Sequence, residues 1–441
     1  MAPSPIADHT DRKNEPFGQL ANPHTSYGAV TSLPGLKNLI ISSICGRTAI
    51  RTYQVILVLF VLATYHSASL SGLIVLSSQV PGILISPIAG ALLDRRGRVA
   101  LIATDFFVAS LAIGLITALA SFHLLPVWAL FLIVTSASVT QPLSSTGTRS
   151  LYPLVVPRHL WDRANGLDAS TFVVATVFGP VLAGLGVALF GARDALLLPI
   201  ALYLLGAGIL IGVSAPPAPA STTRVLQDAL GGLRYVLSNK TLRQLSATVT
   251  LYYCGVGALG VAIPILVIDH LHGGATTTGL MLAVLGVGGS FASIATGAIG
   301  TVGREHRLMA GSCLIAGLML ALLALCAHDE VLAFVALLVI GATQGPLNIT
   351  MFSVRQRVTE PAWYGRAFAI SMSLNGVGSP IGSAIVGALI GHSFVLAFLL
   401  ASSVVLISGI WPIVFPFETG EKASSTVRPG GDAASAEGAS I

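Results

Sequence analysis

Three charged side chains lie inside long apolar runs of this chain, and each could bind an ion or move a proton there. Arg47 and Arg51 are four residues apart, so they share one face of the predicted helix 37–64. Asp105 lies about two turns into the predicted helix 99–120. A charge in hydrocarbon costs several kcal/mol unless it is paired or hydrated. We therefore expect an arginine that contacts an anionic group, a carboxylate that takes a proton, or an internal Arg47–Asp105 ion pair.

The sequence carries no arrangement of residues that favours catalysis or a resident cofactor. It has no phosphate-binding glycine loop, so ATP is not the expected energy source. The four cysteines lie in or beside apolar runs and form no CxxC pair, which indicates small buried side chains. His270 and His272 are too few for a metal site. We expect no enzyme activity, no cofactor and no metal.

The composition places the chain among membrane proteins. Hydrophobic residues make up 54% and charged residues 9% of its 441 residues, whereas soluble domains carry about 25% charged residues. The mean hydropathy is +0.84. A spanning helix needs about 20 mostly apolar residues. The apolar runs predict twelve spans, at 37–64, 71–92, 99–120, 126–145, 169–190, 195–214, 244–268, 278–300, 308–327, 331–351, 367–390 and 394–416.

The basic residues predict the orientation of these spans. With the N-terminus inside, twenty of the 23 lysine and arginine residues fall in cytoplasmic segments, and the outer loops hold only Arg193. This asymmetry follows the positive-inside rule. It predicts an even number of spans, cytoplasmic termini and a location in the cytoplasmic (inner) membrane. The net charge of +5 then reflects topology, and nucleic-acid binding is not needed to explain it.

The expected fold is all-α, with twelve transmembrane helices in two pseudo-symmetric six-helix bundles. A Pro-rich stretch followed by an amphipathic one separates the bundles and predicts a linker with a helix on the inner membrane surface. The polar, Ala- and Ser-rich ends predict disordered tails. The expected units are a tail over 1–35, a bundle over 36–214, the linker over 215–243, a bundle over 244–416 and a tail over 417–441.

Four landmarks recur between the halves at spacings of 200 to 207 residues, which indicates an internal repeat. Parallel repeats of this kind place a binding site between the halves, near the bilayer midplane. The matched landmarks are Gly90–Arg98 with Gly297–Arg304, Gly179-Pro180 with Ser379-Pro380, Arg149 with Arg355, and Arg163 with Arg366.

The segment Gly90–Arg98 predicts a tight basic turn between two spans. Gly90 would allow close helix packing, and Gly97 permits a positive φ. Asp94 can accept hydrogen bonds at a helix N-terminus and meet its positive dipole.

The pattern G-x-L-x-D-R-x-G-R in this segment resembles the loop between helices 2 and 3 of major facilitator superfamily transporters. The resemblance implies the major facilitator fold. It also implies that Asp94 latches the first half to the start of helix 11, near residues 365–367. Arg95 and Arg98 match basic positions of the family and would bridge neighbouring helix ends. The counterpart at 297–304 keeps Gly303-Arg304 but has no acidic residue.

Span 5 contains Gly179 and Pro180 in the run FGPVLAG, which predicts a bend and a flat packing face. The run resembles the antiporter motif G-P-x-x-G-G, with Ala183 in place of one glycine, and Pro380 is its counterpart in span 11. Residues 153–167 resemble bacterial multidrug and siderophore exporters of the enterobactin-exporter type. The predicted span 4 carries no basic residue, however, so the usual proton-handling residues of such exporters are not assigned.

Spans 1, 4, 7 and 10 line the cavity in the family, so their polar and aromatic residues are further candidates for substrate contacts. Such a set would line a mostly apolar cavity with few fixed charges, which suits amphipathic or aromatic compounds better than sugars. Each one alone is equally compatible with a helix–helix hydrogen bond. The candidates are Gln54, Gln141, Tyr252, Tyr253, Gln344 and Asn348.

The resemblance implies a secondary active transporter that exports a small organic compound by alternating access. A drug, a siderophore or a secondary metabolite would be the substrate, and protons would be the coupling ion. The other expected partner is membrane lipid, and the chain is expected to be a monomer. Two alternatives stay open: import or facilitated diffusion of a metabolite, and a transporter-like receptor without flux.

Asp94→Asn is predicted to impair transport and to leave insertion intact, because it removes the charge of the inner latch but keeps the shape of the side chain. Transport assays and surface expression of the variant check this. Wild-type transport rates would contradict the latch.

Overall fold

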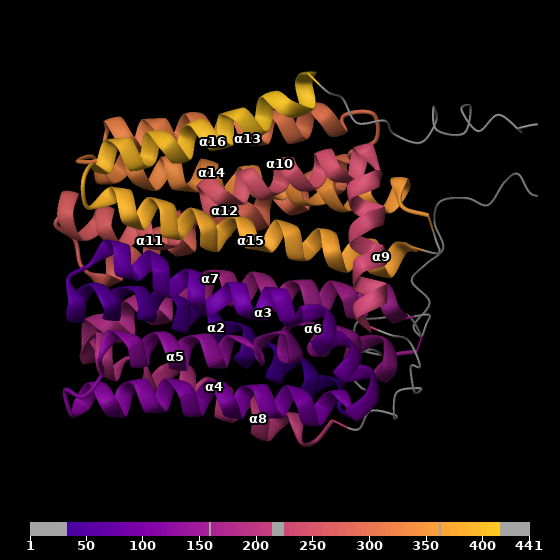
Figure 1. Ribbon diagram of the computed structural model, residues 1–441, viewed down its shortest axis with the longest axis horizontal. Coiled ribbons are helices and arrows are strands. Elements are labelled where there is room, and N and C mark those ends of the chain that lie inside the picture. Colours follow the sequence, from indigo (N-terminus) through magenta and orange to yellow (C-terminus); the bar gives the residue numbers. More distant parts are fainter. Residues whose placement is uncertain (1–32, 158–159, 214–224, 361–362, 415–441) are drawn as a thin grey trace, which may run out of the picture.

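The computed structural model describes residues 33–157, 160–213, 225–360 and 363–414. Within these ranges the secondary structure is helical and no strand occurs. The long helices lie side by side, and α9 (Val225–Ser238) crosses their ends (Figure 1). The expected tails and the Pro-rich start of the linker lie outside the described residues. The all-α polytopic architecture predicted from composition is confirmed.

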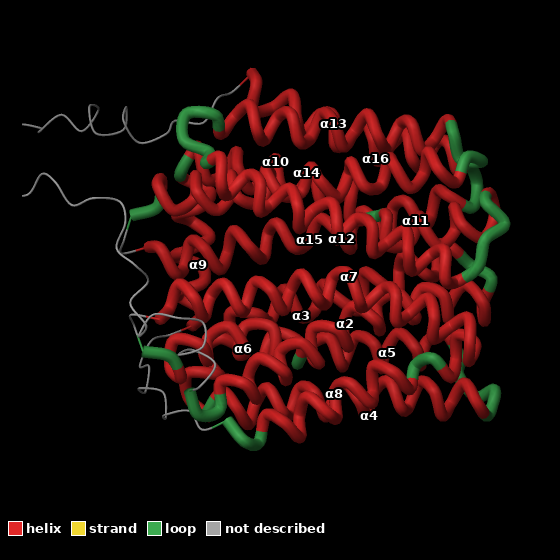
Figure 2. The backbone as a smooth tube through the Cα atoms, turned by 180° about the vertical axis from the view of Figure 1, so that it is seen from behind, coloured by secondary structure: helices red, strands yellow, loops and turns green. Residues whose placement is uncertain are grey.

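The first half of the chain forms one group of helices with its own apolar core. Figure 2 shows α4 and α8 as its outer layer. Its helices are α2 (Leu36–Tyr65), α3 (Ala68–Arg96), α4 (Arg98–Ser121), α5 (Val127–Ser138), α6 (Gln141–Val155), α7 (Trp161–Asp194) and α8 (Leu197–Leu210).

The second half forms another group around a separate core, with α13 and α16 outermost (Figure 2). The first span of this half, which is the seventh predicted for the chain, is continuous but changes from α-helix to π-helix near its end. Its elements are α10 (Lys240–Gly257), α11 (Leu259–Ile265), η3 (Leu266–His270), α12 (Ala275–Ile299), α13 (Glu305–Leu325), α14 (Glu330–Val358), α15 (Tyr364–Ile390) and α16 (Phe394–Val414).

Eleven helices of the described chain are long and apolar enough to cross a membrane. The expected sixth span, 195–214, is the shorter helix α8 of 14 residues. At 1.5 Å per residue it is about 21 Å long, whereas the hydrocarbon core is about 30 Å thick. The preceding span runs on to Asp194 through a break at Gly191, where φ is 80°, and a turn at 195–196 delays the start of α8.

The fourth span is broken and longer than predicted. Its two helices, α5 and α6, meet at residues 139–140, just before Pro142, which fits the first turn of a helix. The span continues past the predicted end at 145 and carries Arg149 on α6. The expectation that span 4 lacks a basic residue is therefore wrong.

The loop between α3 and α4 turns at Gly97, where φ is 85°, and the corresponding loop turns at Gly303, where φ is 73°. The predicted positive φ at Gly97 is confirmed. Gly90 corrects a second expectation: a Cβ there would meet nothing within 4 Å, so this glycine serves no close helix contact. The side chains of Asp94 and Arg95 lie outside the described residues, and the proposed latch stays a prediction.

The two halves pack mainly through α3 with α15 and α7 with α12. Small residues bring these backbones together at the end opposite α9. A Cβ on Gly387 would lie 2.9 Å from the carbonyl oxygen of Ala68, and a Cβ on Gly184 would lie 2.5 Å from that of Ala275. Side chains at these glycines would hold the halves apart, so the glycines close this end of the molecule.

Helix α9 packs across α15 at the other end, where the ring of Tyr235 stacks on that of Trp363 with centroids 5.2 Å apart. A Cβ on Gly232 would lie 3.1 Å from the carbonyl oxygen of Arg366. The tyrosine hydroxyl also accepts a hydrogen bond from the backbone N–H of Glu360 at 3.1 Å. The linker helix is thus fixed to the second half.

Gly184→Ala is predicted to lower the thermal midpoint of the detergent-solubilised protein, because overpacking costs about 1–3 kcal/mol. Gly208→Ala in α8 is the matched control, since its Cβ would meet nothing within 4 Å and alanine favours the helix. Equal midpoints for the two variants would show that the α7–α12 contact is not closely packed.

Candidate functional site

A cavity of about 570 Å³ lies between the two halves, near the middle of the helices that enclose it. Helices α2, α3 and α7 form its wall in the first half, and α10, α11, α12, α14 and α15 form its wall in the second. Ligand pockets measure about 300–1,000 Å³. A cavity of ordinary ligand size therefore exists where the internal repeat predicts a binding site.

Five of the predicted contact residues line this central cavity: Arg51, Gln54, Tyr253, Gln344 and Asn348. Arg51 Nη1 donates to Gln54 Oε1 at 3.3 Å, and Tyr253 Oη donates to Asn348 Oδ1 at 2.8 Å. The first pair belongs to the first half, and the second pair joins α10 to α14. Polar groups of both halves thus face the same space.

Spans 2, 5, 8 and 11 also contribute to the cavity wall. The sequence prediction did not include these spans, because it considered only spans 1, 4, 7 and 10. These spans line it because they form the contact between the halves. A polar side chain in the middle of an apolar run was the available signal for Gln79 and Asn375. The residues missed on these spans include Ser78, Gln79, Thr176, Met372 and Asn375, and the apolar Met351 and Phe352 of span 10 were missed as well.

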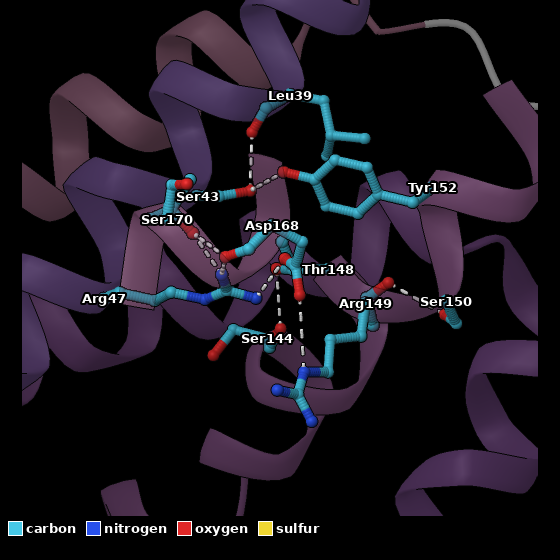
Figure 3. A network of polar contacts seen from close by, with 12 residues as sticks. Leu39, Ser43, Arg47, Ser144, Thr148, Arg149, Ser150, Tyr152, Asp168 and Ser170 are labelled. Carbon is cyan, nitrogen blue, oxygen red and sulfur yellow. Dashed lines mark hydrogen bonds and ion pairs between the residues drawn. The ribbon is translucent and has the colours of Figure 1, made fainter. Parts of the chain in front are cut away.

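Arg47 forms an ion pair with Asp168 of α7, and the expected Arg47–Asp105 pair is absent from the described structure. Arg47 Nη2 lies 2.6 Å from Asp168 Oδ1, and Nη1 donates to the Asp168 carbonyl oxygen at 2.8 Å. Arg149 Nε approaches the other carboxylate oxygen at 3.5 Å. Figure 3 shows both arginines converging on Asp168. The side chains of Arg47 and Asp168 are only 12% and 11% exposed, whereas that of Arg149 is 52% exposed.

The ion cluster of Arg47, Asp168 and Arg149 connects to the central cavity along one face of α7. Residues 168, 172, 176 and 180 are four apart, so they lie one above the other. Phe172 packs beneath both guanidinium groups, 3.9 Å from that of Arg47 and 4.7 Å from that of Arg149. Thr176 and Pro180 line the cavity. A shift of α7 would therefore move the ion cluster and the cavity wall together.

Residues 36–430 match the family of transmembrane secretion effectors within the major facilitator superfamily, MFS_3. The chain belongs to this family. An uncharacterized MFS-type transporter of Sinorhizobium fredii is 32% identical over 404 residues, which cover 89% of this chain and 97% of that protein. Macrolide efflux protein A of Streptococcus pyogenes is 22% identical over 340 residues, or 75% of this chain and 82% of that protein.

A solved structure of the nucleoside transporter NupG shares the fold, with a TM-score of 0.72 over 87% of this chain and all of that one, at 12% identity. The family match and the 32% identical relative make this chain a multi-pass membrane transporter rather than an enzyme. Its fold and its superfamily agree with the resemblance carried by residues 90–98.

Gln141 and Tyr252 of this major facilitator chain lie away from the central cavity. Gln141 begins α6 and lines two small cavities of about 40 and 50 Å³ inside the first half. Tyr252 is fully buried and shares a 2.7 Å hydrogen bond with Thr343. No described residue of the fourth span lines the central cavity, so the expectation of direct contacts from that span is wrong.

Asp105 is 2% exposed and is hydrogen-bonded to Thr140 and Ser144. These hydroxyls lie at the break between α5 and α6. The carboxyl group faces the 40 Å³ cavity, together with Gln141 and Tyr203. Among the described residues no basic side chain pairs with it. Hydroxyl groups therefore surround the Asp105 carboxyl group in place of the arginine, Arg47, that was expected to pair with it.

Gly179 packs against α2 directly behind Arg51. A Cβ there would lie 2.5 Å from the Cβ of Arg51, and Thr52 Oγ1 donates to the Gly179 carbonyl oxygen at 3.1 Å. The next residue, Pro180, faces the cavity, whereas Pro380 is buried within α15 beside the lining residue Ser379. The glycine thus fixes the backbone from which Arg51 enters the cavity.

Asp168→Asn is predicted to lower the thermal midpoint, because removing one partner of a buried ion pair costs about 3–5 kcal/mol. Arg47→Met should lower the midpoint as well. The double variant should lose less than the sum of the two single losses. Asp194→Asn is the control, because its pair with Arg193 is nearly half exposed. Additive losses at Arg47 and Asp168 would contradict the coupling.

Proposed function

We propose that this protein exports a small organic compound from the cell by alternating access, in exchange for protons. The observation that carries the proposal is the polar cavity between two helix groups that meet along α3–α15 and α7–α12. Rocking of the halves about these contacts would expose the cavity to each side in turn.

The described conformation supports an inward-facing state. The glycine contacts close the halves at the end opposite α9, where Gly184 and Gly387 lie. The basic residues of the chain gather at the α9 end, which the positive-inside rule assigns to the cytoplasm. Substrate would then enter from the cytoplasm and leave after the α9 ends close.

Export rather than import is supported by two independent similarities. Macrolide efflux protein A is a relative along most of this chain. The run that contains Gly179 and Pro180 resembles the antiporter motif, and both residues contact the α2 wall or the cavity itself. A facilitator would not need this run.

Asp168 is the proposed site of the coupling proton. Protonation would neutralise the carboxylate and release Arg47 and Arg149, whereas deprotonation would draw them back. The Arg149 side chain is half exposed, so the protein does not fully enclose the ion cluster. Asp105 was the carboxylate expected to carry the proton, but its partners are neutral hydroxyl groups of Thr140 and Ser144, so its protonation would release no basic side chain of the described chain.

Inverted vesicles with and without the chain test export, with a panel of anionic, neutral and cationic compounds. We expect accumulation of at least one compound that depends on an imposed proton gradient. Asp168→Asn should abolish gradient-driven accumulation but retain exchange of labelled for unlabelled substrate. Asp105→Asn should retain both. Gradient-driven accumulation by the Asp168 variant, or its loss only in the Asp105 variant, would refute the assignment. Ligand binding without flux would favour a receptor.

A further inference from the structure

We propose that the substrate is an amphipathic organic anion and that Arg51 binds its anionic group, an inference that rests on the proposed transport function. Arg51 is the only charged side chain that lines the central cavity within the described chain. The cavity wall contains neither aspartate nor glutamate. A cationic compound would therefore meet a like charge and no compensating carboxylate.

Arg51, which faces the cavity, differs from Arg47 in having no counter-ion among the described residues. The two arginines stand one turn apart on the same face of α2. Arg47 has Asp168 as its counter-ion, and Thr171 and the Asp168 backbone accept further bonds. Arg51 has only the neutral amide of Gln54 as a hydrogen-bond partner, at 3.3 Å, and no described carboxylate forms an ion pair with it.

The position of Arg51 makes an unpaired charge costly. It is the sixteenth of the 30 residues of α2, about midway along a helix that spans the membrane. Contact with Gly179 holds its backbone in place, and its side chain is exposed to the cavity. A cation at this depth needs water or a counter-ion. An anionic substrate that displaces the water would supply the counter-ion.

The opposite wall carries groups that would complete an anion site. Tyr253 lines the wall opposite Arg51, and its hydroxyl donates to Asn348 Oδ1 at 2.8 Å. That hydrogen bond leaves the amide N–H₂ of Asn348 available as a donor, and Gln344 adds a second amide to the same wall. An anion between Arg51 and these amides would touch both halves and couple binding to their movement.

The rest of the cavity indicates an apolar body attached to the anionic group. The cavity wall of the second half is lined by apolar side chains, namely Leu282 and Leu285 of α12, Met351 and Phe352 of α14, and Met372 of α15. The flexible thioether side chains of methionine adapt to varied apolar shapes. A simple inorganic ion would leave this surface without contacts. The chemistry therefore fits a carboxylate or sulfonate on a hydrophobic skeleton.

Three probes that share one ring system isolate the effect of charge: 2-naphthoate, its methyl ester and 2-naphthylmethylammonium. Binding to the purified full chain in lipid nanodiscs is measured by competition. We expect naphthoate to bind at least tenfold more tightly than the ester and the ammonium compound to bind most weakly. Equal binding of the three probes, or preference for the ammonium compound, would overturn the proposal.

Variants of Arg51 assign that preference to the cavity. Arg51→Gln should abolish the preference for naphthoate, and Arg51→Lys should keep part of it, because lysine retains the charge but loses the bidentate geometry. Arg193→Gln at the far end of α7 is the matched control and should keep all of it. Thermal midpoints show that each variant is folded, and if Arg51→Gln does not fold, Arg51→Lys and Asn348→Ala decide. Each of these two should weaken the preference for naphthoate, and an undiminished preference in both would overturn the site.

Flux of the same three probes in proteoliposomes separates this inference from the proposed function. Export of the ammonium compound or the ester, independent of Arg51, would leave transport standing and refute the anionic class. Binding of naphthoate through Arg51 without flux of any probe would leave the anion site standing and contradict the proposed export.

Discussion

The cost of a charge in hydrocarbon is the constraint on which the site depends. The first half meets it in three ways. Arg47 and Asp168 neutralise each other. Asp105 lies among hydroxyl groups at a broken helix. Arg51 faces a cavity wide enough for water. The first two arrangements are complete within the protein, whereas the third leaves a charge to be matched by something that enters. The distinction between structural and functional charges therefore follows from their partners rather than from their depth.

Glycine makes this arrangement possible because it lets backbones approach. The contact of Gly179 with α2 holds the backbone of Arg51 against α7, and Gly184 holds α7 against α12. One helix thus connects the residue that faces the cavity to the contact between the halves. The same helix carries Asp168 on the face that leads to Thr176. Any change in the angle between the halves must therefore move α7, and with it the surroundings of both Arg51 and Asp168.

Composition and apolar runs were sufficient to predict the helical fold and most of the spans, because hydrocarbon requires long apolar helices. The same rule located Arg51 as a cavity residue, since an intramembrane charge needs water or a partner. It could not choose the partner of Arg47. The predicted span 5 begins at residue 169 and places Asp168 in a loop, and the predicted span 4 ends before Arg149. Both errors arose at helix ends, where polar residues continue a helix that the hydropathy pattern no longer supports.

The two halves repeat the same contact with different chemistry, and the difference bears on coupling. In the first half, Arg149 near the end of α6 meets Asp168 of α7. In the second half, Arg355 near the end of α14 meets Asn375 of α15. The Asn375 amide oxygen accepts from Arg355 Nη2 at 3.0 Å when the amide is oriented toward it. An amide cannot bind a proton at physiological pH, so the two contacts differ in their chemistry. The buried acid of the second half, Glu305, pairs with Arg357 between α13 and α14, and neither residue lines the cavity. The two contacts are therefore not equivalent: α7 carries a carboxylate there and also holds the backbone of Arg51, whereas α15 carries an amide.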